Sequence, residues 1–168
     1  MSLARRFFTA PRTSYFLFGP RGTGKSTALR MLYPEALFID LLDAELYRRF
    51  QANPNRLREY ALDGEVRTLV IDEIQRVPDL LPVIHQLVEG KDSRHIQYVM
   101  TVSSSRKLKR AGVDLLAGRA VWRNLHPFMA AEIDDWSLEK SLLRGLLPLS
   151  WRAGSWTAVL AIYLAFYL

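Results

Sequence analysis

The chain has 168 residues and a formal net charge of +6, with 49% hydrophobic and 24% charged residues and no cysteine. This length suits one domain with a single core, and the composition excludes a disordered or fibrous protein. The absence of cysteine excludes disulfides, thiolate metal sites and a cysteine nucleophile, and it fits a reducing cytoplasm. Because His85, His95 and His126 show no ligand spacing, a catalytic metal held by protein side chains alone is not expected.

Short apolar runs alternate with helical patterns along the chain, which indicates βαβ units and a parallel sheet covered by helices on both faces. A helix is expected to begin near Lys25. Asp43 and Asn53 can cap two helices after the second strand, and Asp79 can cap another after the third. Strands are expected over residues 14–18, 36–41, 67–73, 95–101 and 119–125.

The segment that follows the first strand, GPRGTGKS, matches the phosphate-binding pattern G-x-x-x-x-G-K-[ST]. Glycines let the backbone curl with its N–H groups pointing inward, and the helix N-terminus adds positive potential. Lys25 would neutralise the β- and γ-phosphates, and Ser26 would offer its hydroxyl to Mg²⁺. The alternative is a glycine-rich turn with an accidental lysine. The pattern predicts an ATP and Mg²⁺ site built from Gly19, Pro20, Arg21, Gly22, Thr23, Gly24, Lys25, Ser26 and Thr27.

An acidic pair, Asp72 and Glu73, stands at the carboxyl end of the third predicted strand. Asp72 is predicted to hold Mg²⁺, usually through water. Glu73 is placed to polarise the attacking water as a general base. Strands often end in acidic turns, so the pair alone is a weak signal. It indicates a nucleotide site because a phosphate-binding loop precedes it in the chain.

Polar residues also end the fourth strand, which lies between the other two in the expected sheet. A side chain there can touch both the γ-phosphate and the attacking water. Thr101 and Ser103 are the candidates, with Ser104 behind them. The alternative is that Ser103, Ser104 or Ser105 caps a helix.

Five segments together resemble a known group, and they are FLFGPRGTGKST, LFIDLLD, LVIDEIQRVPDLL, SSSRKLKR and LLAGRAVWRNLHPF. The group is that of the prokaryotic predicted ATPases of the AAA+ superfamily, which usually carry a further C-terminal domain of unknown function. The resemblance covers about residues 5 to 150. It implies an α/β fold, a three-layer αβα P-loop NTPase with a central parallel sheet of strand order 5-1-4-3-2 and ATP at the carboxyl edge.

The resemblance also implies roles for individual residues. Lys25 and Ser26 would be the Walker A residues, Asp72 and Glu73 the Walker B pair, and Ser103 a sensor of the γ-phosphate. These are the residues expected to bind the nucleotide and act on it.

Two further positions bear on this assignment. Arg119 stands where an arginine acting in trans on a neighbouring subunit is plausible, which would imply a homo-oligomer. The alternative is a surface arginine beside a strand. Val102 stands where family members tend to have glycine, and a branched residue cannot adopt the positive-φ conformations that glycine can.

Mg-ATP hydrolysis coupled to a protein client or a neighbouring subunit is the leading functional hypothesis. Basic residues cluster at 5–6, 48–49, 56–58 and 106–110, which indicates either a polyanion partner such as DNA or a solvated surface. A DNA-associated motor and a nucleotide-binding switch without turnover are therefore alternatives. A small-molecule kinase is less favoured, because Asp72 and Glu73 suit water activation better than transfer to an acceptor hydroxyl.

We expect residues 1–150 to form the ATPase core and residues 151–168 to form an apolar tail, a truncated helix. The uncharged run over residues 153–168 is shorter than the roughly 18–20 residues that a membrane-spanning helix needs. A core helix without its partner is thus favoured over a membrane anchor. No apolar segment near the start resembles a secretory signal, so a cytoplasmic location is expected.

Overall fold

A computed structural model describes residues 6–62, 65–91, 93, 95–103, 116, 118–152, 157 and 161 of the chain. Within this part the strands form one parallel sheet in the order β2-β3-β4-β1-β5. Read from the other edge the order is 5-1-4-3-2, which confirms the expected topology. The strands are β1 (Tyr15–Phe18), β2 (Leu37–Asp40), β3 (Thr68–Asp72), β4 (Gln97–Val102) and β5 (Val121–Asn124).

Helices connect the strands and follow the last one. The 3₁₀ turns are η1 (Pro54–Arg56), η2 (Ile74–Arg76) and η4 (Ala130–Glu132). The α-helices are α1 (Lys25–Leu32), α2 (Ala44–Ala52), α3 (Leu57–Ala61), α4 (Leu80–Glu89), α6 (Leu138–Arg144) and α7 (Pro148–Arg152).

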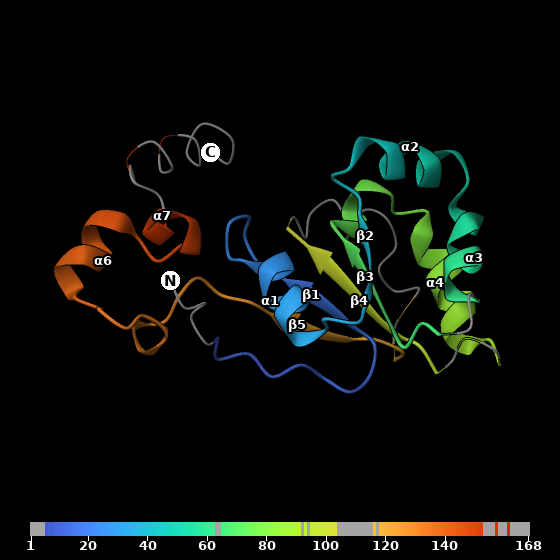
Figure 1. The fold of residues 1–168 in the computed structure, drawn as a ribbon, viewed down its shortest axis with the longest axis horizontal. Coiled ribbons are helices and arrows are strands. Elements are labelled where there is room, and N and C mark those ends of the chain that lie inside the picture. Colours follow the sequence, from blue (N-terminus) through green and yellow to red (C-terminus); the bar gives the residue numbers. More distant parts are fainter. Residues whose placement is uncertain are drawn as a thin grey trace.

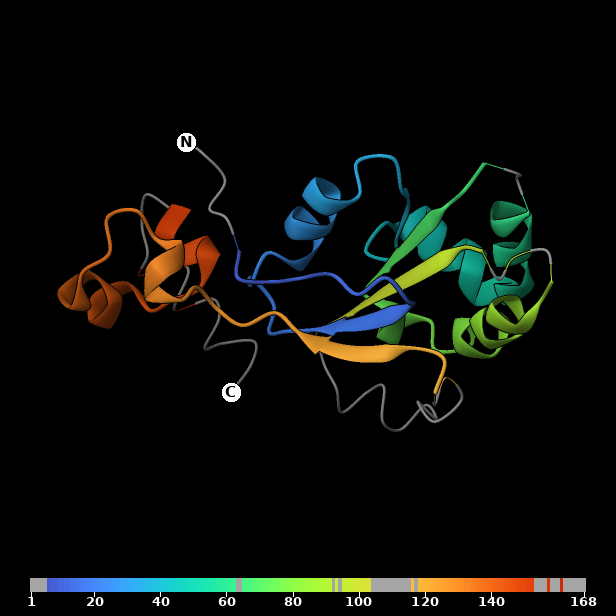
Figure 2. The same ribbon diagram turned by 90° about the horizontal axis from the view of Figure 1, so that it is seen from below.

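The sheet is covered on both faces, because successive side chains of a strand point to opposite sides. Tyr15 and Leu17 of β1 pack in one buried cluster with Leu29 of α1. Phe16 lies in the other cluster, together with Phe50 of α2 and residues of α3 and α4. Figures 1 and 2 show α1 standing apart from the group of α2, α3 and α4. These observations confirm the three-layer αβα architecture.

Most of the expected elements and caps are present, with ends that shift by one or two residues. The Asp43 side chain accepts hydrogen bonds from the first turn of α2, including Glu45 N at 2.9 Å. Asn53 likewise accepts from Asn55 N at 3.1 Å, which starts η1. Asp79 holds the N-cap position of α4, but its side chain makes no capping hydrogen bond.

The parallel arrangement brings the carboxyl ends of β1, β3 and β4 to the same edge of the sheet. Phe18 of β1 is level with Val102 of β4, and Ile71 of β3 is level with Met100. The segments that follow these strands therefore emerge side by side. This edge is where an open α/β sheet binds its ligand.

Helices α6 and α7 lie at the end of the molecule away from α2, α3 and α4 (Figures 1 and 2, orange to red). Their leucines Leu138, Leu142, Leu143 and Leu149 are all exposed. In the part of the chain that the structure describes, no helix is both long enough and apolar enough to cross a membrane. Most of the predicted tail lies outside the described residues, as does the basic run 106–110, and the boundary at residue 150 stays a prediction.

Candidate functional site

The loop between β1 and α1 is shaped by glycines at two points. A Cβ on Gly19 would lie 2.4 Å from the carbonyl oxygen of Leu125, so the loop can pass this backbone only without a side chain. Gly24 precedes α1 with φ of 83°, in the left-handed region that favours glycine. Between them, buried Thr23 donates its hydroxyl to Pro20 O at 2.8 Å, which closes the loop on itself.

Lys25 is the first residue of α1 and is only 5% exposed. Its ammonium group donates to Gly19 O at 2.7 Å, to Pro20 O at 3.3 Å and to Ser103 Oγ at 2.8 Å. Burial lowers the pKa of Lys25, while the nearby carboxylates of Glu73 and Asp72 act in the opposite direction. The loop therefore surrounds a desolvated cation, which is a strong attractor for phosphate.

A pair of oxygen ligands lies beside this lysine. Ser26 Oγ donates to Asp72 Oδ2 at 2.6 Å, and Asp72 is 4% exposed at the end of β3. Among the described residues no group of three His, Cys, Asp or Glu side chains could hold a metal. Mg²⁺ prefers oxygen ligands and keeps phosphate and water oxygens in its shell. Ser26 and Asp72 therefore fit Mg²⁺ bound together with a phosphate chain, rather than a metal held by protein alone.

Glu73 adopts an unusual backbone conformation directly after β3. Its φ of 60° and ψ of 46° lie in the left-handed region, which costs a non-glycine residue about 1–3 kcal/mol. The conformation is held by a hydrogen bond from Glu73 N to Thr101 Oγ1 at 2.9 Å. The carboxylate accepts hydrogen bonds from the Ser103 hydroxyl at 2.5 Å and from the amide nitrogen of Gln75. The side chain is thus held in a fixed orientation.

Thr101 connects the two acidic residues from the neighbouring strand. Its hydroxyl is fully buried, accepts from Glu73 N and donates to the Asp72 carboxylate. The single hydroxyl therefore sets the positions of both acids. Both candidates for the polar residue at the end of β4 make contacts in the site. Ser103 bridges Lys25 and Glu73, and Thr101 bonds to Glu73 N and Asp72.

Replacing Thr101 by Val should lower the free energy of unfolding by about 1–3 kcal/mol, because a buried donor and a buried carboxylate lose their shared partner. Thr101→Ser keeps the hydroxyl and should lose less than half as much. Urea unfolding of the three proteins checks this. A loss for Thr101→Ser as large as that for Thr101→Val would contradict the account of the hydroxyl, because Ser keeps the hydroxyl and lacks only the methyl group.

The predicted residues surround a cavity of about 270 Å³ at the carboxyl edge of the sheet. It is also lined by Leu42, which follows β2, and by Pro148 and Leu149 of α7, none of which was predicted. The predicted residues Gly19, Pro20 and Asp72 contact this lining through hydrogen bonds, since Gly19 O and Pro20 O accept from Lys25 and the Asp72 carboxylate accepts from Ser26. The cavity is lined by the predicted residues Arg21, Gly22, Gly24, Lys25, Ser26, Thr27, Glu73 and Ser103.

Arg119 is the predicted site residue that does not lie with the others around the cavity. It stands two residues before β5, whose first residue Val121 pairs with Tyr15, the first residue of β1. Arg119 is therefore at the amino edge of the sheet, opposite the loop. Its guanidinium binds the Glu89 carboxylate at the end of α4, with Nε at 2.8 Å. A role for Arg119 in the site of its own chain does not fit this position, and a role in trans stays a prediction.

Val102 is the last residue of β4 and is fully buried. Of the described non-glycine residues, Glu73 alone has a positive φ, so the backbone at Val102 needs no glycine. The next residue, Ser103, still reaches both Lys25 and Glu73. The valine is thus compatible with the predicted position of Ser103.

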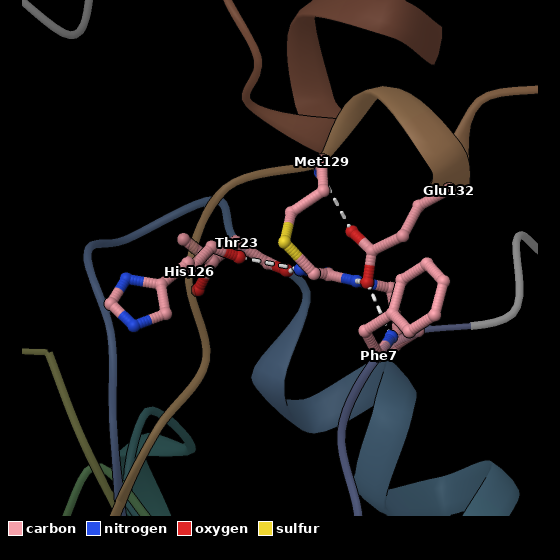
Figure 3. A network of polar contacts seen from close by, with 6 residues as sticks. Phe7, Thr23, His126, Met129 and Glu132 are labelled. Carbon is pink, nitrogen blue, oxygen red and sulfur yellow. Dashed lines mark hydrogen bonds and ion pairs between the residues drawn. The ribbon is translucent and has the colours of Figure 1, made fainter.

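Two charged residues support the loop from outside, and sequence reasoning noted Arg6 only as one of a basic pair and Glu132 not at all. Figure 3 shows Glu132 with Thr23 of the loop and His126 nearby. Arg6 Nη1 donates to the carbonyl oxygen of Thr23 at 2.7 Å, and Arg6 Nε lies 3.1 Å from the carboxylate of Glu132. Glu132 is 5% exposed, in η4. These residues are far apart in sequence and form no local pattern. A buried glutamate is a signal visible only in three dimensions.

Comparison with known proteins agrees with this geometry. The chain matches the family model described as an AAA domain over residues 11–134. Curated relatives include the uncharacterized proteins Rv2008c of Mycobacterium tuberculosis and Mb2031c of Mycobacterium bovis. Each is 33% identical to this chain over 147 residues, which cover 83% of this chain and 31% of the relative. The chain thus spans about a third of the length of these relatives. With a parallel sheet, a phosphate-type loop and a family match over most of its length, the chain belongs to the AAA domain family.

Proposed function

We propose that this chain is an ATPase module that binds Mg-ATP and hydrolyses it. The observation that carries the proposal is a continuous set of contacts around one cavity. Lys25 Nζ bonds to Ser103 Oγ, and Ser103 Oγ bonds to the Glu73 carboxylate, while Ser26 and Asp72 pair alongside. A cation for phosphate, oxygen ligands for a metal and a carboxylate base are the three components that ATP hydrolysis needs.

In the proposed reaction, a water molecule attacks the γ-phosphorus of ATP in line with the bridging oxygen to ADP. Glu73 accepts the proton of this water, the new P–O bond forms, and the bond to ADP breaks. Lys25 and the amides of the loop stabilise the negative charge that spreads over the phosphate oxygens. Mg²⁺, when bound at Ser26 and Asp72, supplies additional charge neutralisation.

Ser103 is proposed to sense the γ-phosphate. Its hydroxyl lies between Lys25 and Glu73 and touches both. A phosphate group that binds Lys25 would compete with Ser103 for the ammonium group. Binding of the γ-phosphate would then alter the hydrogen bond between Ser103 and Glu73. Coupling of nucleotide state to a neighbouring subunit or protein client would begin here.

A second function, nucleotide binding without turnover, is favoured by one observation. Both carboxylate oxygens of Glu73 already accept hydrogen bonds, one from Ser103 and one from Gln75. A base held in this way has fewer free lone pairs for water. Under this alternative ATP binds but phosphate is not released.

A DNA partner is a further alternative, and the described basic residues give it limited support. Arg6 is engaged with Glu132, and Arg49 binds both Glu45 and Tyr60. Arg58 donates to Gln86. These arginines have internal partners, so a DNA footprint would depend on other basic residues. It would appear as binding that weakens steeply with salt.

The affinity for ATP should depend on pH through Lys25. Burial lowers the pKa of Lys25, so the neutral amine forms at a lower pH than for an exposed lysine. Since the phosphates need the ammonium form, affinity should already fall at pH values below the ordinary lysine pKa of about 10.4. Titration of the ATP dissociation constant against pH checks this. Lys25→Arg, which stays charged, should give a flatter profile, and a flat profile for the wild-type chain would contradict the proposal.

The function is tested by phosphate release from the purified chain, measured against its own concentration and with or without DNA. We expect turnover above the Lys25→Ala background. A rise in specific activity with chain concentration that disappears in Arg119→Ala would support an arginine acting in trans. Binding of ATP with release no faster than the Lys25→Ala background would establish the switch instead. Stimulation by DNA that weakens with salt would favour the DNA-associated motor.

A further inference from the structure

The carbonyl oxygen of Thr23 is bonded by the segment that precedes β1. There it accepts a hydrogen bond from Arg6 Nη1 at 2.7 Å. The described peptide bonds are all trans, and a trans peptide directs its C=O and its N–H to opposite sides. Holding the Thr23 carbonyl towards Arg6 therefore turns the N–H of Gly24 away from Arg6. Gly24 lines the cavity and has the positive φ of 83°.

Arg6 can hold this carbonyl firmly because its guanidinium is fixed on every side. Nη2 donates to His126 O at 2.5 Å, and Nε pairs with the Glu132 carboxylate at 3.1 Å. The guanidinium also lies 4.9 Å from the centre of the Phe128 ring. The planar fork of arginine matches such a set of acceptors, and lysine could not reproduce it.

Glu132 in turn is fully paired although it is buried. Its Oε1 accepts from Phe7 N at 2.5 Å, and its Oε2 accepts from Met129 N at 2.9 Å (Figure 3). The Glu132 side chain is 2% exposed and that of Arg6 is 13% exposed. A buried network with every member satisfied is rigid. It fixes the segment before β1 and the segment after β5 around the Thr23 carbonyl.

We propose that Arg6, held by Glu132, is a positioning residue that sets the direction of the Gly24 amide for the phosphates of ATP. The inference rests on the proposed function, since it assigns a task within the same site. The proposed role of Arg6 needs no contact with the nucleotide. It acts through one peptide plane, and its loss would leave the loop free to turn that plane.

The test compares Arg6→Met with Arg49→Met. Both variants remove a guanidinium that is bonded to a glutamate, but Arg49 lies on α2 and pairs with Glu45 and Tyr60. Two quantities are measured at a temperature where circular dichroism shows each protein folded. One is the dissociation constant of a fluorescent ATP analogue with Mg²⁺, and the other is the set of glycine amide resonances in a protein labelled with ¹⁵N-glycine.

We expect Arg6→Met to raise the dissociation constant by about tenfold or more. This is the effect of losing one charge-assisted hydrogen bond, that from the Gly24 amide to a phosphate oxygen. The Gly24 resonance should shift, Arg6→Lys should recover only part of the affinity, and Arg49→Met should stay within about twofold of the wild-type chain. In a Glu132→Gln background the effect of Arg6→Met should shrink, because the two residues act together.

A folded Arg6→Met protein with wild-type affinity and an unmoved Gly24 resonance would overturn the inference and leave the proposed function intact. If Arg6→Met does not fold, Arg6→Lys and Glu132→Gln serve in its place, and a lower melting temperature with unchanged affinity in both would show a purely structural role. A wild-type chain that binds no ATP would instead overturn the proposed function, and the inference with it.

Discussion

Replacing Lys25 by Ala should abolish measurable ATP binding, with a dissociation constant at least about a hundredfold higher, since losing a desolvated charge partner costs about 3 kcal/mol or more. The size follows from burial. Lys25 is 5% exposed, and its ammonium group stands among the loop carbonyls and Ser103, where water screens little. Isothermal titration with Mg-ATP measures the effect.

The matched control for this variant is Lys140→Ala. Lys140 is a lysine far from the loop in sequence, and it pairs with the exposed carboxylate of Asp135. Its removal should leave the affinity unchanged. An Lys25→Ala protein that is folded and binds ATP within about threefold of the wild-type value would show that the loop does not hold the phosphates.

Glu73→Gln should separate binding from hydrolysis. The expected turnover is at least about a hundredfold lower, the usual effect of removing a general base. The dissociation constant for Mg-ATP should stay close to the wild-type value. Glutamine keeps the shape of the side chain and can still accept from the Ser103 hydroxyl, so Lys25 and Ser103 remain in place.

Single-turnover phosphate release measures the rate, and titration of the same protein measures the affinity. Glu45→Gln, a change at an exposed carboxylate on α2, is the control and should leave both unchanged. Wild-type turnover by Glu73→Gln would refute the base assignment. A parallel loss of affinity and turnover would mean that Glu73 shapes the site rather than acting on water.

The fold was largely predictable because its signals are local. Apolar runs mark the strands, and Asp43 and Asn53 mark helix starts through hydrogen bonds made within three residues. The loop could be predicted for the same reason, since Gly19, Gly24 and Lys25 serve one short backbone path. Strand order involves contacts between distant segments, and it came from the resemblance to a family rather than from the residues themselves.

The acidic and hydroxyl residues of the site could be predicted because strand ends are ordered in space. Once β3 and β4 are parallel neighbours, Asp72 and Thr101 must meet at one edge, and their contact confirms this. The positive φ of Glu73 has no sequence signal, because glutamate rarely adopts it and only the surrounding contacts impose it.

The support around the site was not predictable. Arg6 and Glu132 meet across most of the described chain, and neither belongs to a periodic or motif pattern. Helices α6 and α7 were not predicted, although Ser137 caps α6 by accepting a hydrogen bond from Lys140 N at 3.1 Å. The α6 leucines Leu138, Leu142 and Leu143 are exposed, so no buried face fixes this helix on the sheet. Such contacts depend on how the segments after β5 return to the loop.

The place where the nucleotide binds is tested most directly by a crystal structure of the chain with a non-hydrolysable ATP analogue and Mn²⁺. We expect the β- and γ-phosphates beside Lys25 and an anomalous peak for the metal next to Ser26 Oγ and the Asp72 carboxylate. A nucleotide bound elsewhere on the molecule, or a metal peak away from both Ser26 and Asp72 in a crystal that holds the analogue, would contradict the account.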